Sequence, residues 1–328
     1  MTNKNLYVLA GVAALFGVAA YFIGGGMKPS APRLNGKMIV PGLNAADVSR
    51  IEIGNSLKLA ASEKGWVVES LYGYPASREK IVENLLKVAE LKVGQVARGR
   101  KLGAETSVVL KDSAGKTLAE LKLGDTHTRK PTGQAAMYGG GSYPDGRYLA
   151  FEGETVLVKD PLDAFSGDAK KWCETRIASV PSADVTAVTY EHGSEKVELE
   201  KGTNSTWVLK GLGPKEELDS SKTYSLDSAL SYLDFNSVAD PSLAEAELGF
   251  ATGYVYTVTL KEGSNTVKRV ARIGNKVKGG SDRYFKLDDS KWVFAISSYS
   301  AENMMKKRAD LVKAKEEPKK EEPKKQDK

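Results

Sequence analysis

The chain has 328 residues, of which 41% are hydrophobic and 27% charged. A disordered protein carries too little apolar surface to offset the entropy lost on folding, so this composition excludes a mainly disordered chain. The length exceeds that of a usual single domain and favours two folded units of ordinary size. The formal net charge of +6 includes +2 from residues 313–328, where seven lysines accompany five acidic residues. No stripe of Arg and Lys alternates with aromatic residues, so we expect no nucleic-acid partner.

The first apolar segment, Leu6–Ile23, contains no charge and no proline. At about 1.5 Å per residue, its length together with Gly24–Gly26 approaches the thickness of the hydrocarbon core of a bilayer. We therefore expect a single transmembrane helix within residues 1–26, with residues 6–23 contacting the lipid bilayer. A cleaved signal peptide is the alternative, because the small residues Ala19-Ala20 are typical of a cleavage site.

The basic residues beside this segment leave its orientation open. Lys4 lies before it, and Lys28, Arg33 and Lys37 follow it, a distribution that by the positive-inside rule favours a cytoplasmic body. Those three charges are dispersed, however, and the whole body follows the anchor. Cys173 is the only cysteine of the chain, so cysteine usage fits either compartment.

The two ends of the body read as unstructured connections. Residues 27–43 are rich in Gly, Pro and small side chains, which predicts an extended linker. Residues 313–328 repeat the letters EEPKK and have no apolar period, which predicts a disordered, solvated tail.

Between these ends the sequence repeats its pattern of elements. Residues 110–124 and 260–274 each read as a strand, a polar turn and a second strand that ends in glycine, at identical length. Residues 147–159 align without a gap to residues 283–295, again as strand, acidic turn and strand. The same order of elements therefore occurs twice.

Helical patterns accompany the strands of both repeats. Ser77 is a suitable N-cap for a helix whose apolar residues recur at near-helical spacing up to Leu91, and Ser225 precedes a shorter helix. We expect further helices at residues 162–173 and 301–313.

These patterns predict an α+β fold class. We expect an N-terminal transmembrane helix followed by two tandem, similar units at 44–180 and 181–312, each with an antiparallel, hairpin-rich sheet packed on helices. Duplication would explain the similarity of the two units. Convergent hairpin patterning is the alternative.

Side chains that would form a catalytic or metal site are scarce. His127 and His192 fall in non-equivalent places, and neither has a partner at the i+4 spacing of a helical zinc site. The lone Cys173 cannot build a thiolate site, and Ser142 lacks the closing glycine of a nucleophile elbow. We therefore expect no catalytic residue, no metal, no cofactor and no enzymatic activity.

One segment has a weak likeness to a phosphate-binding loop. Gly115-Lys116-Thr117 resembles the end of such a loop, but Leu110 occupies the position of the required first glycine. The equivalent Gly263-Ser264-Asn265 in the second repeat indicates a hairpin turn at both places.

The longest glycine-rich loop comprises residues 137–146, with the sequence MYGGGSYPDG. Tyrosines on glycine-rich backbone are typical of recognition loops. The candidate contact residues are Tyr138, Gly139, Gly140, Gly141 and Tyr143. The alternative is a flexible connection between strands, because glycine permits a conformation without specifying one.

Several of these segments together resemble one bacterial family. They are Gly65-Trp66-Val67-Val68, Tyr74-Pro75-Ala76, Leu110-Lys111-Asp112 with Gly115, Leu121-Lys122-Leu123-Gly124, and residues 147–158, 163–172 and 176–180. In this combination the chain resembles the domain of unknown function 4340 family over most of residues 44–312. The resemblance implies a single-pass protein of the bacterial inner membrane with a periplasmic body, often encoded beside gliding-motility-type or auxiliary ABC transport components. It implies a protein partner and no reaction.

The leading functional prediction is a non-enzymatic, membrane-anchored extracytoplasmic protein. It would act as a binding or scaffolding subunit associated with an ABC-type transport or motility complex. An alternative is a periplasmic module that binds cell-wall glycan or peptide through the loop that carries Tyr138 and Tyr143. A third is a hydrolase whose acids, such as Asp145 and Glu152, converge only in the fold.

Overall fold

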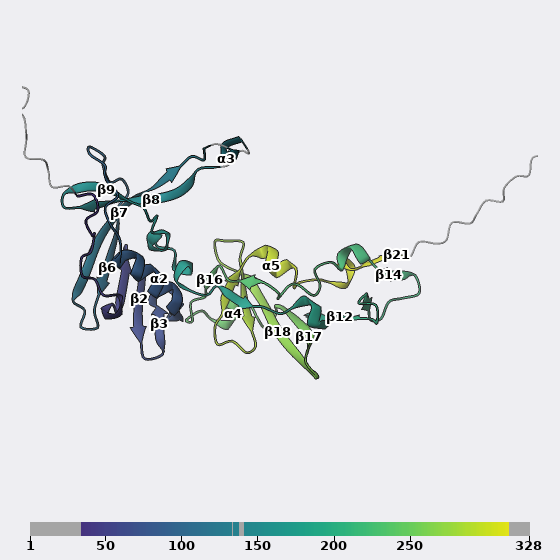
Figure 1. Ribbon diagram of the computed structural model, residues 1–328. Helices are drawn as coiled ribbons and strands as arrows, with labels where there is room; N and C mark the ends of the chain where they lie inside the picture. Colours follow the sequence, from purple (N-terminus) through teal and green to yellow (C-terminus); the bar gives the residue numbers. More distant parts are fainter. Residues whose placement is uncertain (1–33, 133, 138–140, 315–328) are drawn as a thin grey trace, which may run out of the picture. The chain divides into compact units, whose positions relative to one another are not determined.

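The computed structural model describes residues 34–132, 134–137 and 141–314 (Figure 1). The expected anchor at 1–26 lies outside these residues, as do residues 27–33 of the expected linker at 27–43 and nearly all of the expected tail at 313–328. Within the described part of the chain, no helix has the length and apolar character needed to cross a membrane.

The described residues form a mainly β protein, so the expected α+β class with sheets packed on helices is wrong. Their α-helices are α2 (Arg78–Ala89), α3 (Gln134–Met137), α4 (Glu245–Leu248) and α5 (Ser298–Glu302). Single 3₁₀ turns occur at η1 (Ala45–Asp47), η2 (Glu69–Leu71), η3 (Asp163–Ser166), η4 (Ala169–Trp172), η5 (Ser182–Asp184), η6 (Ser220–Lys222) and η7 (Arg308–Asp310). Among these described helices only α2 has the length to cover a sheet, so strands supply most of the core.

The strands before residue 160 pair antiparallel. They are β1 (Arg50–Ile53), β2 (Leu57–Ser62), β3 (Gly65–Val68), β4 (Tyr74–Pro75), β5 (Gln95–Val96), β6 (Thr106–Lys111), β7 (Thr117–Arg129), β8 (Tyr143–Phe151) and β9 (Glu154–Val158). Strands β4, β3, β2, β1 and β6 are neighbours in that order, and so are β7, β8, β9 and β5.

A second antiparallel sheet follows residue 184. Its strands are β11 (Val185–His192), β12 (Glu195–Lys201), β13 (Trp207–Leu209), β16 (Ser237–Val238), β17 (Tyr254–Glu262), β18 (Asn265–Lys276), β19 (Arg283–Leu287) and β20 (Phe294–Ile296), in the order β13-β12-β11-β17-β18-β19-β20-β16. Two small ribbons pair β10 (Arg176–Ala178) with β15 (Leu233–Asp234) and β14 (Glu216–Leu218) with β21 (Val312–Ala314).

By packing, the described residues form two compact units. One comprises residues 34–43, 87–105 and 121–161, and the other comprises residues 44–86, 106–120 and 162–314. This division differs from the predicted boundaries at 44–180 and 181–312, which follow the succession of the two sheets along the chain.

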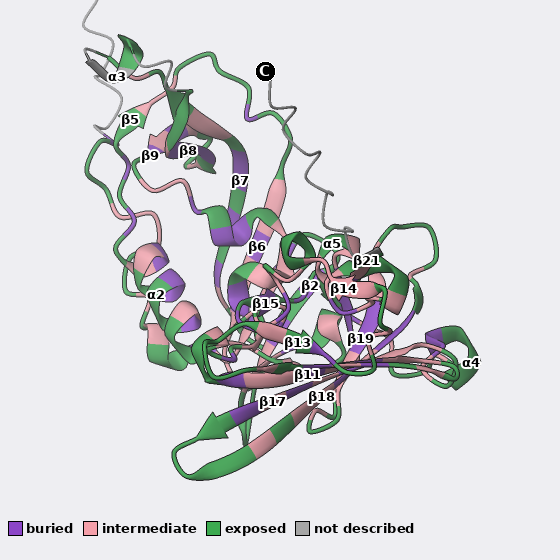
Figure 2. Ribbon diagram, turned by 90° about the vertical axis from the view of Figure 1, so that its right-hand side faces the viewer, coloured by how far each residue is buried: buried purple, intermediate pink, exposed green. Residues whose placement is uncertain are grey.

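The core forms where apolar side chains alternate along strands. In β17, Tyr256, Val258 and Leu260 are buried, and the residues between them are intermediate in exposure. Figure 2 colours the strands by this burial. Val188 and Tyr190 of β11 lie opposite Val258 and Tyr256 and are buried too. This two-residue period is what places one face of an antiparallel sheet in the core.

The predicted helices have mixed outcomes. The backbone N–H of Lys80 donates to the Ser77 hydroxyl at 3.5 Å, and Ile81 and Leu85 of the following α2 are buried, as the spacing predicts. The segment after Ser225 forms only turns, because serines compete for backbone hydrogen bonds; the Ser228 hydroxyl donates to the Ser225 carbonyl at 3.4 Å.

The two other predicted helices are shorter than expected. Residues 162–173 form the 3₁₀ turns η3 and η4 rather than one helix. Residues 301–313 contain the end of α5, the turn η7 and then β21, whose pairing with β14 requires an extended backbone. Strand pairing thus overrides the local helical pattern.

Tyr74 of β4 joins the first set of strands to the second sheet within the larger unit. Its ring lies edge-on to Phe235 and Trp292, with centroid distances of 5.2 Å to each, and 5.9 Å from Phe294. Three residues further on, the backbone N–H of Ser77 donates to the Trp172 carbonyl at 2.7 Å. The Tyr-Pro-Ala segment therefore has a structural role at a joint between sheets.

Candidate functional site

The predicted recognition loop closes the hairpin of β7 and β8. Tyr138, Gly139 and Gly140 lie outside the described residues. Gly141 is exposed, and Tyr143 at the start of β8 exposes 47% of its surface. The short helix α3 enters the loop and ends in Met137, which is 85% exposed.

The hairpin continues as a two-stranded ribbon past its neighbour β9. Strand β9 stops pairing with β8 at Arg147, opposite Val158, whereas β8 remains paired to β7 as far as Tyr143, opposite Arg129. Figure 1 shows this ribbon extending from β9 towards α3. We define the β7–β8 ribbon as residues 126–129 and 143–146. Within the described residues, its β8 strand pairs with another strand on one side only.

A charged cluster fixes the side chains of the ribbon. The His127 Nδ1 atom hydrogen-bonds to Asp145 Oδ1, and Arg129 Nε lies 2.7 Å from Asp145 Oδ2. Strand pairing brings these residues together, because His127 lies opposite Gly146 and Thr128 opposite Pro144. The hydrogen bond from His127 and the Arg129 charge hold the pKa of the Asp145 carboxyl below its usual range.

Aromatic contacts continue the cluster into the body of its unit. The His127 ring lies edge-on to Tyr148 with centroids 5.8 Å apart. The guanidinium carbon of Arg100 lies 3.9 Å from the centroid of the Tyr148 ring, and Arg100 also forms an ion pair with Asp125 at 3.8 Å. The cation–π contact restricts both side chains at the base of the ribbon.

The hydrogen bond between Asp145 and His127 resembles the carboxylate–histidine contact that orients a catalytic histidine. A carboxylate that holds a histidine is useful in nucleophilic catalysis when the other ring nitrogen faces a hydroxyl or thiol. Within the described residues, the contacts of His127 go to Asp145 and Tyr148, and none goes to such a nucleophile. No group of three His, Cys, Asp or Glu side chains suited to a metal ion occurs there either.

The two acids of the hydrolase alternative have separate cationic partners. Asp145 binds His127 and Arg129, whereas Glu152, in the turn after β8, pairs with Lys37 at 3.0 Å. A hydrolytic site of the acid–base kind needs two carboxyl groups that flank one reacting bond. These two side chains do not form such a pair.

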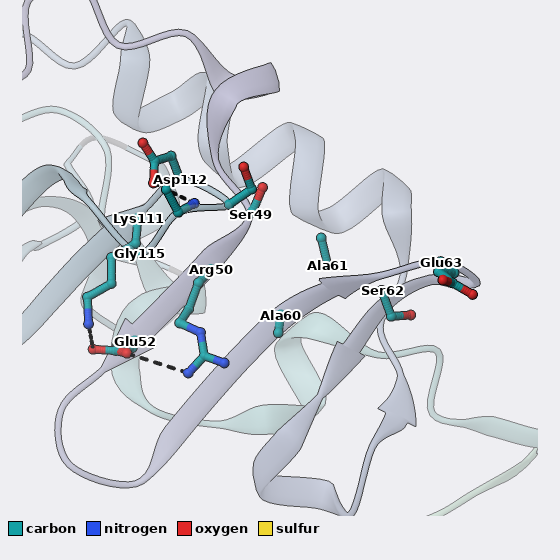
Figure 3. Close-up of a pocket in the computed structure, with 12 residues that line it drawn as sticks. Ser49, Arg50, Glu52, Ala60, Ala61, Ser62, Glu63, Lys111, Asp112 and Gly115 are labelled. Atoms are coloured by element: carbon teal, nitrogen blue, oxygen red, sulfur yellow. Dashed lines mark hydrogen bonds and ion pairs between the residues drawn. The ribbon is translucent and has the colours of Figure 1, made fainter.

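A cavity of about 730 Å³ lies over β1, β2 and the turn between β6 and β7 (Figure 3). Lys111 Nζ lies 2.8 Å from Glu52 and Arg50 lies 3.9 Å from it, and Figure 3 shows both cations directed at that carboxylate. The hydrogen bond from Lys111 lowers the pKa of Glu52. Both cations of the lining are thus paired with Glu52.

The turn that borders this cavity is the segment with the likeness to a phosphate loop. Asp112 Oδ1 accepts from the backbone N–H groups of Ala114 and Lys116 at 2.9 Å each, and Gly115 adopts a φ of +83°. These donors are therefore bound to a side chain of the turn itself, as in an Asx turn. The hairpin-turn prediction is confirmed.

Comparison with protein families gives one match. A family model described as a domain of unknown function, DUF4340, matches residues 66–248, which is more than half of the chain. The chain belongs to the DUF4340 family. No curated protein and no solved structure matches it.

The region matched by DUF4340 contains the ribbon and the Tyr74 joint. It begins at β3 and ends with α4, so β1 and β17 lie outside it. In this chain β1 pairs with β6 and β17 pairs with β11. The residues matched by the DUF4340 model therefore include part of each sheet, and each sheet also has strands outside them.

Sequence patterns predict the position of the ribbon but not the contact between its charged side chains. The glycine-rich loop marks the tip, but spacing along the chain gives His127 no partner. The signal that joins His127 to Asp145 is the strand pattern on both sides of the loop, since a hairpin closing near residue 136 brings these positions opposite one another.

Proposed function

We propose that this DUF4340 protein is a membrane-tethered, non-catalytic binding or scaffolding subunit that contacts a protein partner through the β7–β8 ribbon. The observation that carries the proposal is the exposure of Met137 in α3 and of Tyr143, which lies opposite Arg129 at the end of the ribbon. Tyr, Met and Arg are the residue types enriched at protein interfaces, and exposed apolar side chains of this size have a cost in water.

The charged cluster supports this role by reducing the flexibility of the contact residues. Asp145 binds Arg129 at 2.7 Å and also binds His127, so the same carboxylate restrains both side chains. A side chain that is ordered before binding loses less entropy when a partner docks. The ribbon therefore favours a partner surface with an apolar pocket for the tyrosine and an acidic rim for the arginine.

The proposals of a membrane tether and of an ABC-type partner rest on the sequence. Residues 6–23 are apolar and uncharged, and we propose that they hold the body at the bacterial inner membrane on the periplasmic side. The family resemblance supports an ABC-type transport or motility complex as the partner. Protease added to spheroplasts that carry a tag after Lys328 tests the location: digestion from outside supports a periplasmic body, and protection until lysis contradicts it.

Recovery of the partner tests the contact. The full chain is crosslinked in cells, purified in detergent and analysed by mass spectrometry for ABC-type transporter components. We expect Arg129→Glu combined with Tyr143→Ala to reduce their recovery by about tenfold or more, because loss of one or two interface anchors costs at least about 1.4 kcal/mol. Tyr299→Ala is the matched control, since Tyr299 is 76% exposed in α5 and belongs to the other unit.

Equal recovery from the double variant and the wild type would contradict the ribbon contact. Absence of transporter components from the wild-type sample would contradict the partner class. A thermal melt of each variant verifies folding, and we expect little change, since Arg129 and Tyr299 are largely exposed and Tyr143 is 47% exposed.

A further inference from the structure

The positive charge of the chain is concentrated in the smaller of the two compact units, residues 34–43, 87–105 and 121–161. These residues contain eleven Lys or Arg and seven Asp or Glu, a formal net charge of +4, whereas the described residues of the larger unit carry −2. Residues 27–33, which lead into the smaller unit, add Lys28 and Arg33 and no acid. The smaller unit therefore has the charge to attract an acidic partner.

Much of this positive charge is not neutralised within the unit. Among its described residues, six exposed Lys and Arg side chains have no ion-pair or hydrogen-bond partner, whereas only three exposed acidic side chains are unpaired in the same sense. Lys92 and Lys159 belong to the six. An unpaired surface cation can bind an external anion without first breaking an internal contact.

Lys92 and Lys159 line one cavity. The cavity has a volume of about 530 Å³, and its lining runs from the end of α2 through residues 90–94 to Lys159 and Asp160. The two sides are held together, because the backbone N–H of Gly94 donates to the Leu157 carbonyl at 2.9 Å. Glu90 is the unpaired acid of this lining, so the two free lysines outnumber it. The cavity thus favours an anionic group.

The described chain begins beside this cavity. The Gly36 backbone N–H donates to the Val93 carbonyl at 2.7 Å, and a single antiparallel bridge pairs Met38 with Lys92. Val93 and Lys92 both line the cavity. The first described residues therefore run along its wall.

This position keeps the cavity near the proposed membrane tether. Seven residues separate Gly26, where the proposed tether ends, from Leu34. An extended chain spans at most about 3.6 Å per residue, so Leu34 lies within roughly 30 Å of the end of the tether. Lys28 and Arg33 lie in the connecting residues, and basic residues next to a membrane anchor are drawn to anionic lipid.

We propose that the smaller unit docks on anionic phospholipid headgroups through a cavity face, defined as residues 36–39 and 91–94 with Lys159. In this arrangement Lys92 and Lys159 bind a lipid phosphate at the cavity. The inference rests on the membrane tether of the proposed function and does not depend on the ribbon's partner. Because the contact is electrostatic, it requires acidic lipid and weakens as salt is added.

Fluorescence quenching of the full chain in vesicles tests this contact. Gln95→Cys, at an exposed position next to the cavity lining, carries a fluorophore that nitroxide-labelled lipid headgroups quench. Cys173 is buried and should stay unlabelled. We expect quenching to be stronger in vesicles of phosphatidylcholine with phosphatidylglycerol than in phosphatidylcholine alone, and concentrated salt to remove the difference.

Charge reversal separates a specific face from a general effect of net charge. Lys92→Glu combined with Lys159→Glu should lower the equilibrium constant for docking by about tenfold or more, because each lysine near an anionic surface adds several-fold to the affinity. Lys64→Glu combined with Lys116→Glu is the matched control. It makes the same change of charge at exposed positions between strands of the larger unit and should keep the quenching that depends on phosphatidylglycerol.

Equal quenching with and without phosphatidylglycerol would overturn the inference, and so would an equal loss in the two double variants. Flotation of the same vesicles separates this result from the tether. A chain that floats with the vesicles but shows no dependence on lipid charge contradicts the cavity face alone. A chain that does not float contradicts the tether, and the cavity face with it.

Discussion

Arg147 donates a hydrogen bond from Nε to the carbonyl oxygen of Gly124 at 2.9 Å. Arg283 makes the equivalent contact in the second sheet, from Nη1 to the carbonyl of Gly274, also at 2.9 Å. Both contacts lie at a break in register, between positions 123 and 126 of β7 and between positions 273 and 276 of β18. In each case the arginine binds a carbonyl at the irregular part of the strand pairing.

The two glycines at these breaks share a second property. A Cβ atom on Gly124 would collide with the Leu102 carbonyl oxygen, and one on Gly274 would collide with the Leu248 carbonyl oxygen. The same backbone approach therefore occurs at the matching glycine of each sequence repeat. Both strands continue past the glycine, to Arg129 in β7 and Lys276 in β18, so the paired details explain a glycine inside the second strand of each repeat rather than at its end.

Alanine at either glycine should destabilise the protein. Gly124→Ala and Gly274→Ala each force a side chain against a backbone carbonyl, and we expect each to lower the free energy of unfolding by about 1–3 kcal/mol or more. Urea denaturation measures the change. Gly141→Ala is the control, because a Cβ there would meet nothing within 4 Å. Similar stability of Gly124→Ala and Gly141→Ala would show that the close approach has no energetic role.

Removal of the Tyr74 ring should weaken the joint between the sheets. Tyr74→Ala removes edge-on contacts with Phe235, Trp292 and Phe294, and we expect a loss of roughly 2–4 kcal/mol in thermal or urea unfolding. Tyr74→Phe should keep most of the stability, since the hydroxyl lies 3.4 Å from the Glu174 carbonyl and makes at most a weak hydrogen bond. A phenylalanine variant as unstable as the alanine variant would contradict the aromatic account.

Acid should loosen the attachment of the C-terminal strand β21. Glu216 in β14 accepts from the Gly213 N–H at 2.8 Å and from Arg308 Nη2 at 2.6 Å, and these contacts lower its pKa. A carboxyl whose pKa is depressed by folding adds stability above its unfolded pKa and loses it as pH falls through the folded pKa.

Comparison of Tm across pH tests this linkage. Glu216→Gln should melt at a lower temperature than the wild type at pH 7, and the difference should shrink as the pH falls through the depressed pKa of the folded Glu216 carboxyl, where the wild-type side chain becomes protonated. Glu217→Gln is a neighbouring control, because the Glu217 carboxylate pairs with Lys313 at the surface of the same ribbon. A difference that persists unchanged at acid pH would contradict the role of the Glu216 charge.

The single cysteine should react only when the fold opens. Cys173 is buried, and burial raises the pKa of its thiol to about 12, so almost no thiolate exists at neutral pH. Iodoacetamide should label the native protein far more slowly than the urea-unfolded protein. Rapid labelling of the native chain would mean that the segment around Trp172 opens readily.

Local sequence patterns predict the elements that depend on near neighbours. The hairpins at residues 110–124 and 260–274 form because a polar turn separates two alternating strands, and the turn at Asp112 closes through its own side chain. The helix after Ser77 forms because its apolar spacing matches one buried face. These features need no knowledge of the rest of the chain.

Features that depend on distant residues are not predictable in this way. Residues 301–313 have a helical pattern, but β21 pairs with β14, which lies far earlier in the sequence. A cavity at Ser231 combines residues 179–183 with residues 231–232, which the pairing of β10 with β15 and the hydrogen bond from Val180 to Leu230 bring together. The predicted fold class is wrong for the same reason, since three of the four expected helices have weak local signals that strand pairing and serine-rich turns outweigh.

The most direct test of the proposed partner contact is photocrosslinking from the ribbon in intact cells. A photoreactive amino acid replaces Tyr143 in the full chain, and a second variant carries it in place of Tyr299. We predict that position 143 forms an adduct with an ABC-type transporter component, that position 299 does not, and that Arg129→Glu removes the adduct. The absence of any adduct at 143, or the same adduct from both positions, would contradict the proposal that the β7–β8 ribbon binds the partner.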